Sequence, residues 1–406
     1  MRSSFAMNRT VAVTIALVVA GCGAPPSPEP VRPAPLPSAT ATRNTLSELF
    51  APREGEAAIV PKPADAQGPP REVEAKQVEA EKAVAAEPST RTVVSLVQGL
   101  DGEAESLVRQ GDRAYGETRY ADAEKLYGKA RLLAPKHAAG AVGQARARIG
   151  KLGLGLELGI AKGNPIVKTQ IAELRRAVRL SDEFAPGHYE LGRALLLVDD
   201  AAGALSSLER ASQLLPQHPE VQSTYGVALI ASGKSDLSVV AFTKARDLDS
   251  AVASRHGNLA TALMMMGRTK EAIVEYESAV RLAEGDARAH SDYGTALLAS
   301  GDLERATKEL QRALVLDPGR AAIHSNLGYA LALRSKNAEA IVEYREAIRL
   351  DGKLISAWIN LATVLARDPA TRGEARAALE KAKSLDPTDP RVKVNLQELD
   401  QLDGKK

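Results

Sequence analysis

The sequence predicts an all-α fold in which pairs of helices stack into a solenoid. Aligned on itself, the 406-residue chain repeats a pattern with a period of 34 residues. Aromatic residues make up only 3% of the chain, and small or straight-chain residues, which suit closely packed helices, replace them. Glycine and proline recur at fixed places in the pattern, where they would turn the chain between helices or end a helix.

The repeat is defined by small and large residues at four positions of the 34-residue unit. Position 8 holds a small residue, at Gly111, Ala145, Gly192, Gly226, Ala260, Gly294, Gly328 and Ala362. Alanine dominates position 20 (Ala123, Ala204, Ala272, Ala306, Ala340, Ala375) and position 27 (Ala130, Ala177, Ala211, Ala245, Ala279, Ala313, Ala347, Ala382). Position 24 is large, at Tyr127, Leu174, Leu208, Phe242, Tyr276, Leu310, Tyr344 and Leu379.

These positions describe how two antiparallel helices pack within one unit. Small residues let helix axes approach to about 8–10 Å, and no unit buries its apolar face unless its neighbours stack on it. The pattern closely resembles the tetratricopeptide-repeat (TPR) family over residues 104–389. We therefore expect a TPR α-solenoid of about eight helix-turn-helix repeats. Residues 390–406 then form a capping helix and tail, because Val392, Leu396 and Leu399 recur at helical spacing.

Residues 1–21 are predicted to be a signal peptide. Arg2 and Arg9 precede an apolar run, Val11–Ala20, that is shorter than the roughly 20 residues needed to span a bilayer. The run ends in Val-Ala-Gly-Cys, which resembles the lipobox of bacterial lipoproteins, and Cys22 is the only cysteine of the chain. The resemblance implies lipidation of Cys22. Glycine in place of aspartate after the cysteine favours the outer membrane, with the protein facing the periplasm.

Residues 22–90 are predicted to be a disordered linker behind the lipidated cysteine. Residues 23–90 hold 13 of the 22 prolines and few large apolar residues, so they cannot bury enough surface to fold. Residues 91–103 are a lead-in segment between this linker and the repeats.

Two departures from the period occur near the second repeat. About 13 extra residues, 151–163, carry an alternation of leucine with mostly glycine, at Leu152, Leu154, Leu156 and Leu158, which is a strand signal. Two interpretations stay open: a loop folded back on the solenoid, or an apolar protrusion that a partner covers. Within the repeat itself, Gln170 replaces a small residue and Arg148 replaces a leucine.

No catalytic, cofactor-binding or metal-binding motif stands out, so we expect neither an enzyme nor a cofactor. The 53 basic and 51 acidic residues nearly balance, which gives no reason to expect a nucleic-acid partner, and we expect no small-molecule substrate. Four of the six histidines share position 4 of their repeats, where Trp358 stands in the last one. Equivalent positions on stacked helices lie too far apart to share a metal ion. We predict packing residues, with a pH response as the alternative.

The predicted partner-binding groove is lined by positions 6 and 9 of the first helices. In the TPR family, first helices line a concave groove, and asparagine at position 6 resembles a ladder that grips an extended peptide backbone. An amide both donates and accepts hydrogen bonds, so it can pair with any peptide bond; the alternative is that asparagine is merely a polar surface residue. The predicted groove residues are Asn258, Asp292, Asn326 and Asn360 at position 6, with Thr261, Thr295, Tyr329 and Thr363 at position 9.

The sequence thus favours a lipid-anchored protein-interaction scaffold in the cell envelope, which binds segments of envelope proteins during assembly of a larger machine. Similar plans, a lipobox followed by TPR units, occur in type IV pilus pilotins, in a lipoprotein of the β-barrel assembly machine and in gliding-motility lipoproteins. The alternative is a TPR module of a glycan or polysaccharide export or modification system, such as the repeats attached to protein O-glycosyltransferases.

Overall fold

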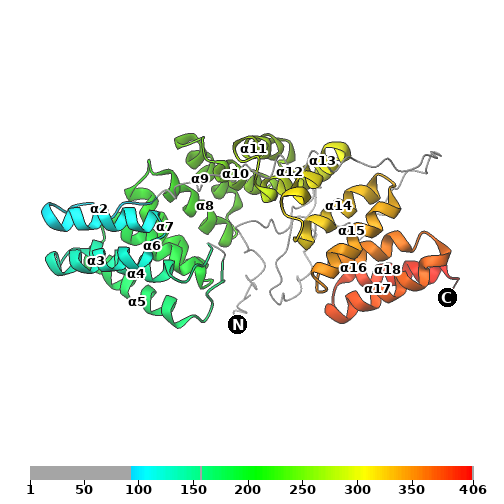
Figure 1. The fold of residues 1–406 in the computed structure, drawn as a ribbon, viewed down its shortest axis with the longest axis horizontal. Coiled ribbons are helices and arrows are strands. Elements are labelled where there is room, and N and C mark those ends of the chain that lie inside the picture. Colours follow the sequence, from blue (N-terminus) through cyan, green and yellow to red (C-terminus); the bar gives the residue numbers. More distant parts are fainter. Residues whose placement is uncertain (1–92, 156–157, 405–406) are drawn as a thin grey trace, which may run out of the picture. The chain divides into compact units, whose positions relative to one another are not determined.

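The computed structural model describes residues 93–155 and 158–404, and every regular element in these ranges is a helix (Figure 1). Cys22, the signal segment and the linker lie outside the described residues. The chain divides into two compact units, whose described parts are residues 93–155 with 158–267, and residues 268–404. The N-terminal unit contains α2 (Gly102–Gly116), α3 (Tyr120–Leu133), α4 (Ala138–Gly150), α5 (Pro165–Leu180), α6 (Ala185–Leu197), α7 (Ala201–Leu214), α8 (Pro219–Ala231), α9 (Ser235–Leu248) and α10 (Ala253–Met265).

The C-terminal unit continues the same alternation of first and second helices. It contains α11 (Thr269–Leu282), α12 (Ala287–Ser300), α13 (Leu303–Leu316), α14 (Ala321–Leu333), α15 (Asn337–Leu350), α16 (Ile355–Leu365), the 3₁₀ turn η2 (Pro369–Thr371), α17 (Arg372–Leu385) and α18 (Pro390–Leu402). In chain order these helices make eight first–second pairs followed by α18. The predicted fold class, an all-α TPR solenoid with a capping helix, is confirmed.

In the five repeats with glycine at position 8, the core is built on the contact between position 8 and position 24. Position 24 side chains are at most 1% exposed in every repeat. A Cβ added to Gly226 would lie 2.7 Å from the Phe242 ring, and one added to Gly294 would lie 2.7 Å from Leu310 Cγ. Real Cβ atoms do not approach this closely, so the missing side chain is what lets the two helices of a repeat touch.

The turn inside the repeat depends on one left-handed residue at position 15. Gly233, Gly267 and Gly301 have φ of 73°, 70° and 82°. Thr118, Asp199 and Ser335 occupy the same place with φ of 59°, 68° and 61°. A left-handed backbone costs a residue with a Cβ roughly 1–2 kcal/mol, so these three turns are strained where the glycine turns are not.

Position 4 fixes the turn that joins its helix to the preceding one. In six consecutive repeats its side-chain N–H donates to the backbone carbonyl six residues earlier, at 3.0–3.2 Å, from His188, Gln222, His256, His290, His324 and Trp358. A carbonyl oxygen only accepts, so Nε2 of each histidine carries the hydrogen. The four repeat histidines are 6–8% exposed and are packing residues, as predicted.

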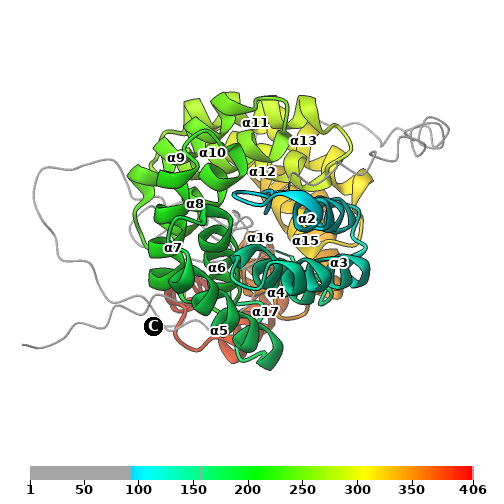
Figure 2. The same cartoon turned by 90° about the vertical axis from the view of Figure 1, so that its left-hand side faces the viewer.

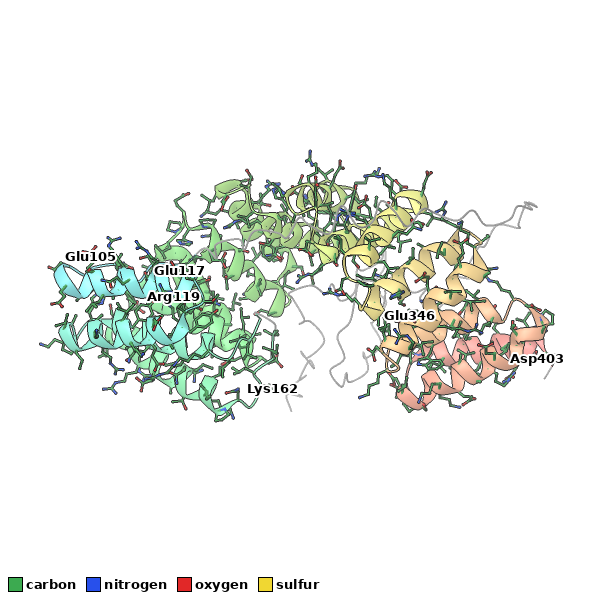
Figure 3. The ribbon with its side chains drawn as sticks, viewed as in Figure 1. Glu105, Glu117, Arg119, Lys162, Glu346 and Asp403 are labelled. Carbon is green, nitrogen blue, oxygen red and sulfur yellow. The ribbon has the colours of Figure 1, made fainter. Side chains whose placement is uncertain are left out.

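The insertion folds back as a loop on the C-terminal end of α6. The Gly159 and Ala161 N–H groups donate to the Leu196 and Leu197 carbonyls at 3.0 and 2.8 Å, and Lys162 (labelled in Figure 3) pairs with Asp199. The strand signal was wrong for the described part of 151–163, because left-handed Gly153 and Gly159 turn the backbone. These contacts favour the folded-back loop. Leu152, Leu154 and Leu158 are half-buried, and Leu156 lies outside the described residues.

The two unusual residues of the second repeat contact each other. Arg148 Nη1 donates to Gln170 Oε1 at 3.4 Å, and Arg148 Nε donates to Glu124 at 2.8 Å. Gln170 is 4% exposed, so a polar contact replaces the apolar one of the other repeats. Across the described stretches of the chain, no helix is both long and apolar enough to cross a bilayer.

Candidate partner-binding surface

The first helices of each unit form a continuous layer. In the N-terminal unit α2 contacts α4, α4 contacts α6 and α6 contacts α8; Figure 2 shows α6 and α8 side by side with α7 and α9 beyond them. In the C-terminal unit α12, α14, α16 and α18 follow one another in the same way. We call the side of this layer that carries positions 6 and 9 the first-helix face. It is where the sequence places a partner.

Residues 93–97 already lie on the first-helix face of repeats 1 and 2, as a segment without helix, turn or bend whose burial alternates as in an extended chain. Val94 and Leu96 are 2% and 0% exposed, whereas Ser95 between them is exposed. Arg146 Nη1 donates to the Val94 carbonyl at 2.8 Å, and the Leu96 N–H donates to Asp112 Oδ2 at 2.9 Å. The Ser95 hydroxyl donates to the same oxygen at 2.9 Å. Asp112 and Arg146 therefore bind backbone groups of an extended chain.

Asp112 and Arg146 belong to a buried network that links the first three repeats. The Arg146 side chain is fully buried; it pairs with Asp112 Oδ1, bonds the Tyr127 hydroxyl and stacks over the Tyr115 ring at 4.7 Å. Its other guanidinium nitrogen lies 3.6 Å from Glu190, which also pairs with Arg193 at 3.1 Å. We call Asp112, Tyr115, Tyr127 and Arg146 the lead-in seat.

The charges of this network are matched. Burial lowers the pKa of Arg146, but Tyr127, Asp112 and Glu190 raise it further, so that it ends above its ordinary value. Burial raises the pKa of the Tyr127 hydroxyl well above its usual range. Arg146 therefore stays cationic and Tyr127 stays neutral. Two acids and two arginines, spread over α2, α4 and α6, balance each other without the lead-in residues.

A cavity of about 280 Å³ adjoins the lead-in seat. Tyr115, Arg146, Glu190 and Arg193 form its polar side. The insertion also lines the cavity, through residues 153–155. The 13 extra residues thus add a wall beside the seat.

The structure corrects the prediction for two of the groove residues. Asn326 and Thr295 are each 1% exposed, and Asn326 Nδ2 donates to Thr295 Oγ1 at 3.0 Å across α14 and α12. The same pairing of position 9 with position 6 occurs at the chain end, where the Thr363 hydroxyl donates to Asn395 at 3.1 Å. At these places the asparagines tie neighbouring first helices together, because their amides lie between helices and not above them.

The remaining predicted groove residues differ in access. Thr363 is exposed, while Asn258 and Tyr329 are half-buried; Thr261 and Asn360 are 7% and 9% exposed. Asn258 Nδ2 donates to Ser223 at 3.3 Å. The Asp292 side chain keeps 18% exposure and lies 3.9 Å from Arg288. Burial raises the pKa of Asp292 to about 7, against the opposing effect of Arg288.

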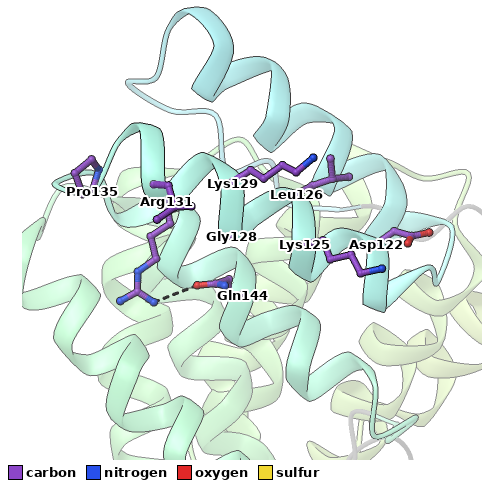
Figure 4. Close-up of a pocket in the computed structure, with 9 residues that line it drawn as sticks. Asp122, Lys125, Leu126, Gly128, Lys129, Arg131, Pro135 and Gln144 are labelled. Carbon is purple, nitrogen blue, oxygen red and sulfur yellow. Dashed lines mark hydrogen bonds between the residues drawn. The ribbon is translucent and has the colours of Figure 1, made fainter.

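A second, more open hollow lies on the other side of the first repeat (Figure 4). It measures about 910 Å³ and is lined mainly by α3, including Lys125, Lys129 and Leu132, which is 82% exposed. Arg131 donates to Gln144 at 3.1 Å at its edge. This hollow is a surface depression between long side chains, without the buried polar groups of the lead-in seat.

The lead-in seat was not predicted from the sequence, although its charged residues stand at position 9 of the repeat, one of the positions expected to bind a partner. Asp112, Arg146 and Arg193 occupy position 9 of repeats 1 to 3, and Glu190 occupies position 6 of repeat 3. Reading positions 6 and 9 from the first repeat onward would have shown two acids and three arginines in adjacent repeats. Their joint burial, and the lead-in beside them, come only from the structure.

Comparisons with known proteins agree with the repeat architecture. Residues 263–328 match the tetratricopeptide repeat family model. Among solved structures, the Cut9–Hcn1 hetero-tetramer of APC/C matches 74% of this chain with 18% identity and a TM-score of 0.53; this chain covers 57% of that chain's length. No curated protein matches the sequence.

Two shorter solved structures also match parts of the chain. PilF of Pseudomonas aeruginosa covers 53% of it with 18% identity and a TM-score of 0.47, and 98% of PilF is matched. YrrB, described as a TPR protein with an unusual peptide-binding site, covers 48% with 20% identity and a TM-score of 0.40, over its whole length. At these identities the likeness concerns the fold. The chain thus has the fold of a TPR solenoid.

Proposed function

We propose that this protein is a lipid-anchored scaffold of the bacterial cell envelope that holds extended segments of partner proteins on its first-helix face. The observation that carries the proposal is the lead-in seat. There, Asp112 and Arg146 bind an extended chain through its backbone N–H and C=O groups while two alternate apolar side chains are buried. A surface that recognises backbone groups can take segments of many sequences, which suits an assembly scaffold.

The support for a lipid anchor comes from the sequence. The Val-Ala-Gly-Cys run before residue 23 supports lipidation of Cys22, and several acyl chains would hold the protein at the outer membrane. The proline-rich residues 23–90 would keep the repeats away from the lipid. Pilus secretin assembly, gliding motility and secretion complexes are the envelope machines that fit this plan.

Photocrosslinking in cells tests whether the first-helix face binds proteins. A photoreactive amino acid is placed at Thr363 or Tyr329 on first helices, and at Val342 on the second helix α15 as the matched control, since Val342 is 62% exposed. We expect Thr363 and Tyr329 to capture defined envelope proteins that Val342 does not. Equal capture from all three sites, or no capture from the first-helix sites, would refute the proposal.

The anchor and the machine are tested separately. Labelled palmitate should enter the unchanged protein and not Cys22→Ser, and the variant should leave the membrane fraction. In a deletion strain of a pilus-bearing host, loss of secretin multimers on a gel would support the pilus machine. Normal multimers would remove that machine and leave the scaffold proposal to the crosslinking result.

A further inference from the structure

Residues 93–97 are bound as a separate peptide ligand would be bound. The segment belongs to no helix, its apolar side chains alternate inward, and its backbone is fixed by side chains of α2 and α4. Only residues 98–101 join it to α2. A tether this short keeps the segment beside the seat, at an effective concentration on the order of millimolar.

The lead-in seat recognises a definite pattern. Arg146 donates to the carbonyl of the first residue, and Asp112 accepts from the amide N–H two residues later. Both residues that carry these groups bury an aliphatic side chain, and the residue between them is exposed with a small hydroxyl that reaches Asp112. An extended segment with aliphatic residues at two alternate positions and a small polar residue between them satisfies the seat.

The seat is organised independently of the segment it holds. Asp112 remains bonded to Tyr127 at 2.9 Å and paired with Arg146, and Arg146 also faces Glu190 and Tyr115. Removing residues 93–97 therefore leaves no buried charge without a partner, so departure carries no electrostatic penalty of the kind that breaking a buried pair would. The adjoining 280 Å³ cavity adds room for a segment longer than the lead-in.

We propose that residues 93–97 occupy in cis a peptide site that an extended segment of a partner protein takes over in exchange. The partner segment carries aliphatic residues at two alternate positions. This inference rests on the proposed scaffold function and adds its regulation: partners with weak segments are excluded by the lead-in, and binding of a strong one releases residues 93–97 from the array. The lead-in thereby couples partner binding to the chain that leads toward residue 22.

The test uses the full chain and a fluorescent peptide of residues 93–99, VVSLVQG. Val94→Asp/Leu96→Asp empties the seat, and Leu132→Asp/Leu133→Asp adds the same two charges at sites 82% and 52% exposed on α3 as the matched control. Anisotropy titration should give a Kd at least about tenfold lower for the seat variant than for the unchanged chain or the control, because the cis competitor is gone. Adding Asp112→Ala to the seat variant should abolish binding.

Several outcomes would overturn the inference. A folded seat variant that binds no better than the unchanged chain would do so, as would binding that Asp112→Ala does not affect, or an unchanged chain that dimerises by exchanging its lead-in. If the aspartate pair prevents folding, Val94→Ala/Leu96→Ala should give the same order of affinities. If the peptide titration fails while Thr363 gives crosslinks in cells, the lead-in exchange is wrong and the scaffold function stands. If the peptide exchanges but no crosslink forms in cells, the exchange stands and the scaffold function is wrong.

Discussion

Asp292 tests how the repeats are built, because its carboxylate differs from the asparagine amide of neighbouring repeats in one heavy atom and one charge. It occupies position 6, where repeats 5, 7 and 8 have asparagine, and replacing it by asparagine keeps its size and removes its charge. Burial raises the pKa of Asp292 from its ordinary 3.8 to about 7; Arg288 and Arg320 oppose the shift and Asp286 adds to it. Asp292→Asn should therefore stabilise the C-terminal unit when the carboxylate would be charged.

The sign and size follow from linkage. Since the folded-state pKa exceeds the unfolded one, the folded state holds a proton that the unfolded state has lost between about pH 4 and pH 7. Stability is full below pH 4 and falls as pH rises through 7. Roughly three pKa units correspond to at most about 4 kcal/mol. We expect about half, ~2 kcal/mol, because the side chain keeps 18% exposure and water screens the charge.

Urea unfolding followed by circular dichroism at pH 5 and pH 8 makes the measurement. Asp292→Asn should unfold at higher urea than the unchanged chain at pH 8, and the difference should shrink at pH 5. The matched control is Asp302→Asn, an N-cap on the same unit that stabilises α13 through the Arg305 N–H, and which should show no such gain at pH 8. A variant less stable than the unchanged chain at pH 8 would refute the assigned environment of Asp292.

Three further predictions concern the repeat and the seat. His324→Phe removes the ring hydrogen bonds to Pro318 and Glu343 and should cost about 2–4 kcal/mol in urea melts at pH 6. Burial lowers the pKa of His324, but the Glu343 and Pro318 bonds raise it further, so the loss of stability should shrink as pH rises through the raised pKa. A pH-independent loss would contradict this prediction. Gly301→Ala should cost about 1 kcal/mol of thermal stability, and Ser335→Gly should gain a smaller amount, because both turns need a positive φ. A Cβ at Gly301 meets nothing within 4 Å, so only the backbone conformation opposes it. Two stability changes of the same sign would count against this prediction. Arg146→Met removes the ion-pair partner of the mostly buried Asp112 carboxylate and should cost roughly 3–5 kcal/mol in the N-terminal unit. Faster limited proteolysis of that unit would show the loss, and unchanged proteolysis would exclude it.

The repeat and its core could be predicted from sequence because they are local and periodic. In the five repeats with glycine at position 8, that glycine faces a large residue at position 24, sixteen residues later and within one helix pair. Position 4 also repeats, so its packing role could be inferred, although the bond of His324 to a carbonyl six residues earlier required the structure.

The candidate site was harder to predict because it depends on contacts between repeats. Whether Asn326 points outward or sideways is decided by Thr295, 31 residues away on another helix. The contacts of Arg146 come from Asp112, Glu190 and a lead-in segment that no repeat pattern describes. The insertion misled for a different reason: its alternation indicates a strand, but glycine at the alternate positions frees the backbone to turn.

Both proposals depend on the first-helix face binding an extended chain through its backbone, and hydrogen exchange at the Leu96 amide measures this most directly. In the full chain, exchange read at single-residue resolution should be slowed by on the order of a hundredfold or more relative to an unstructured chain, because the N–H donates to Asp112 at a residue that is fully buried. Asp112→Ala should return the exchange toward the unstructured rate. A Leu96 amide that exchanges at that rate in the unchanged protein would contradict the account.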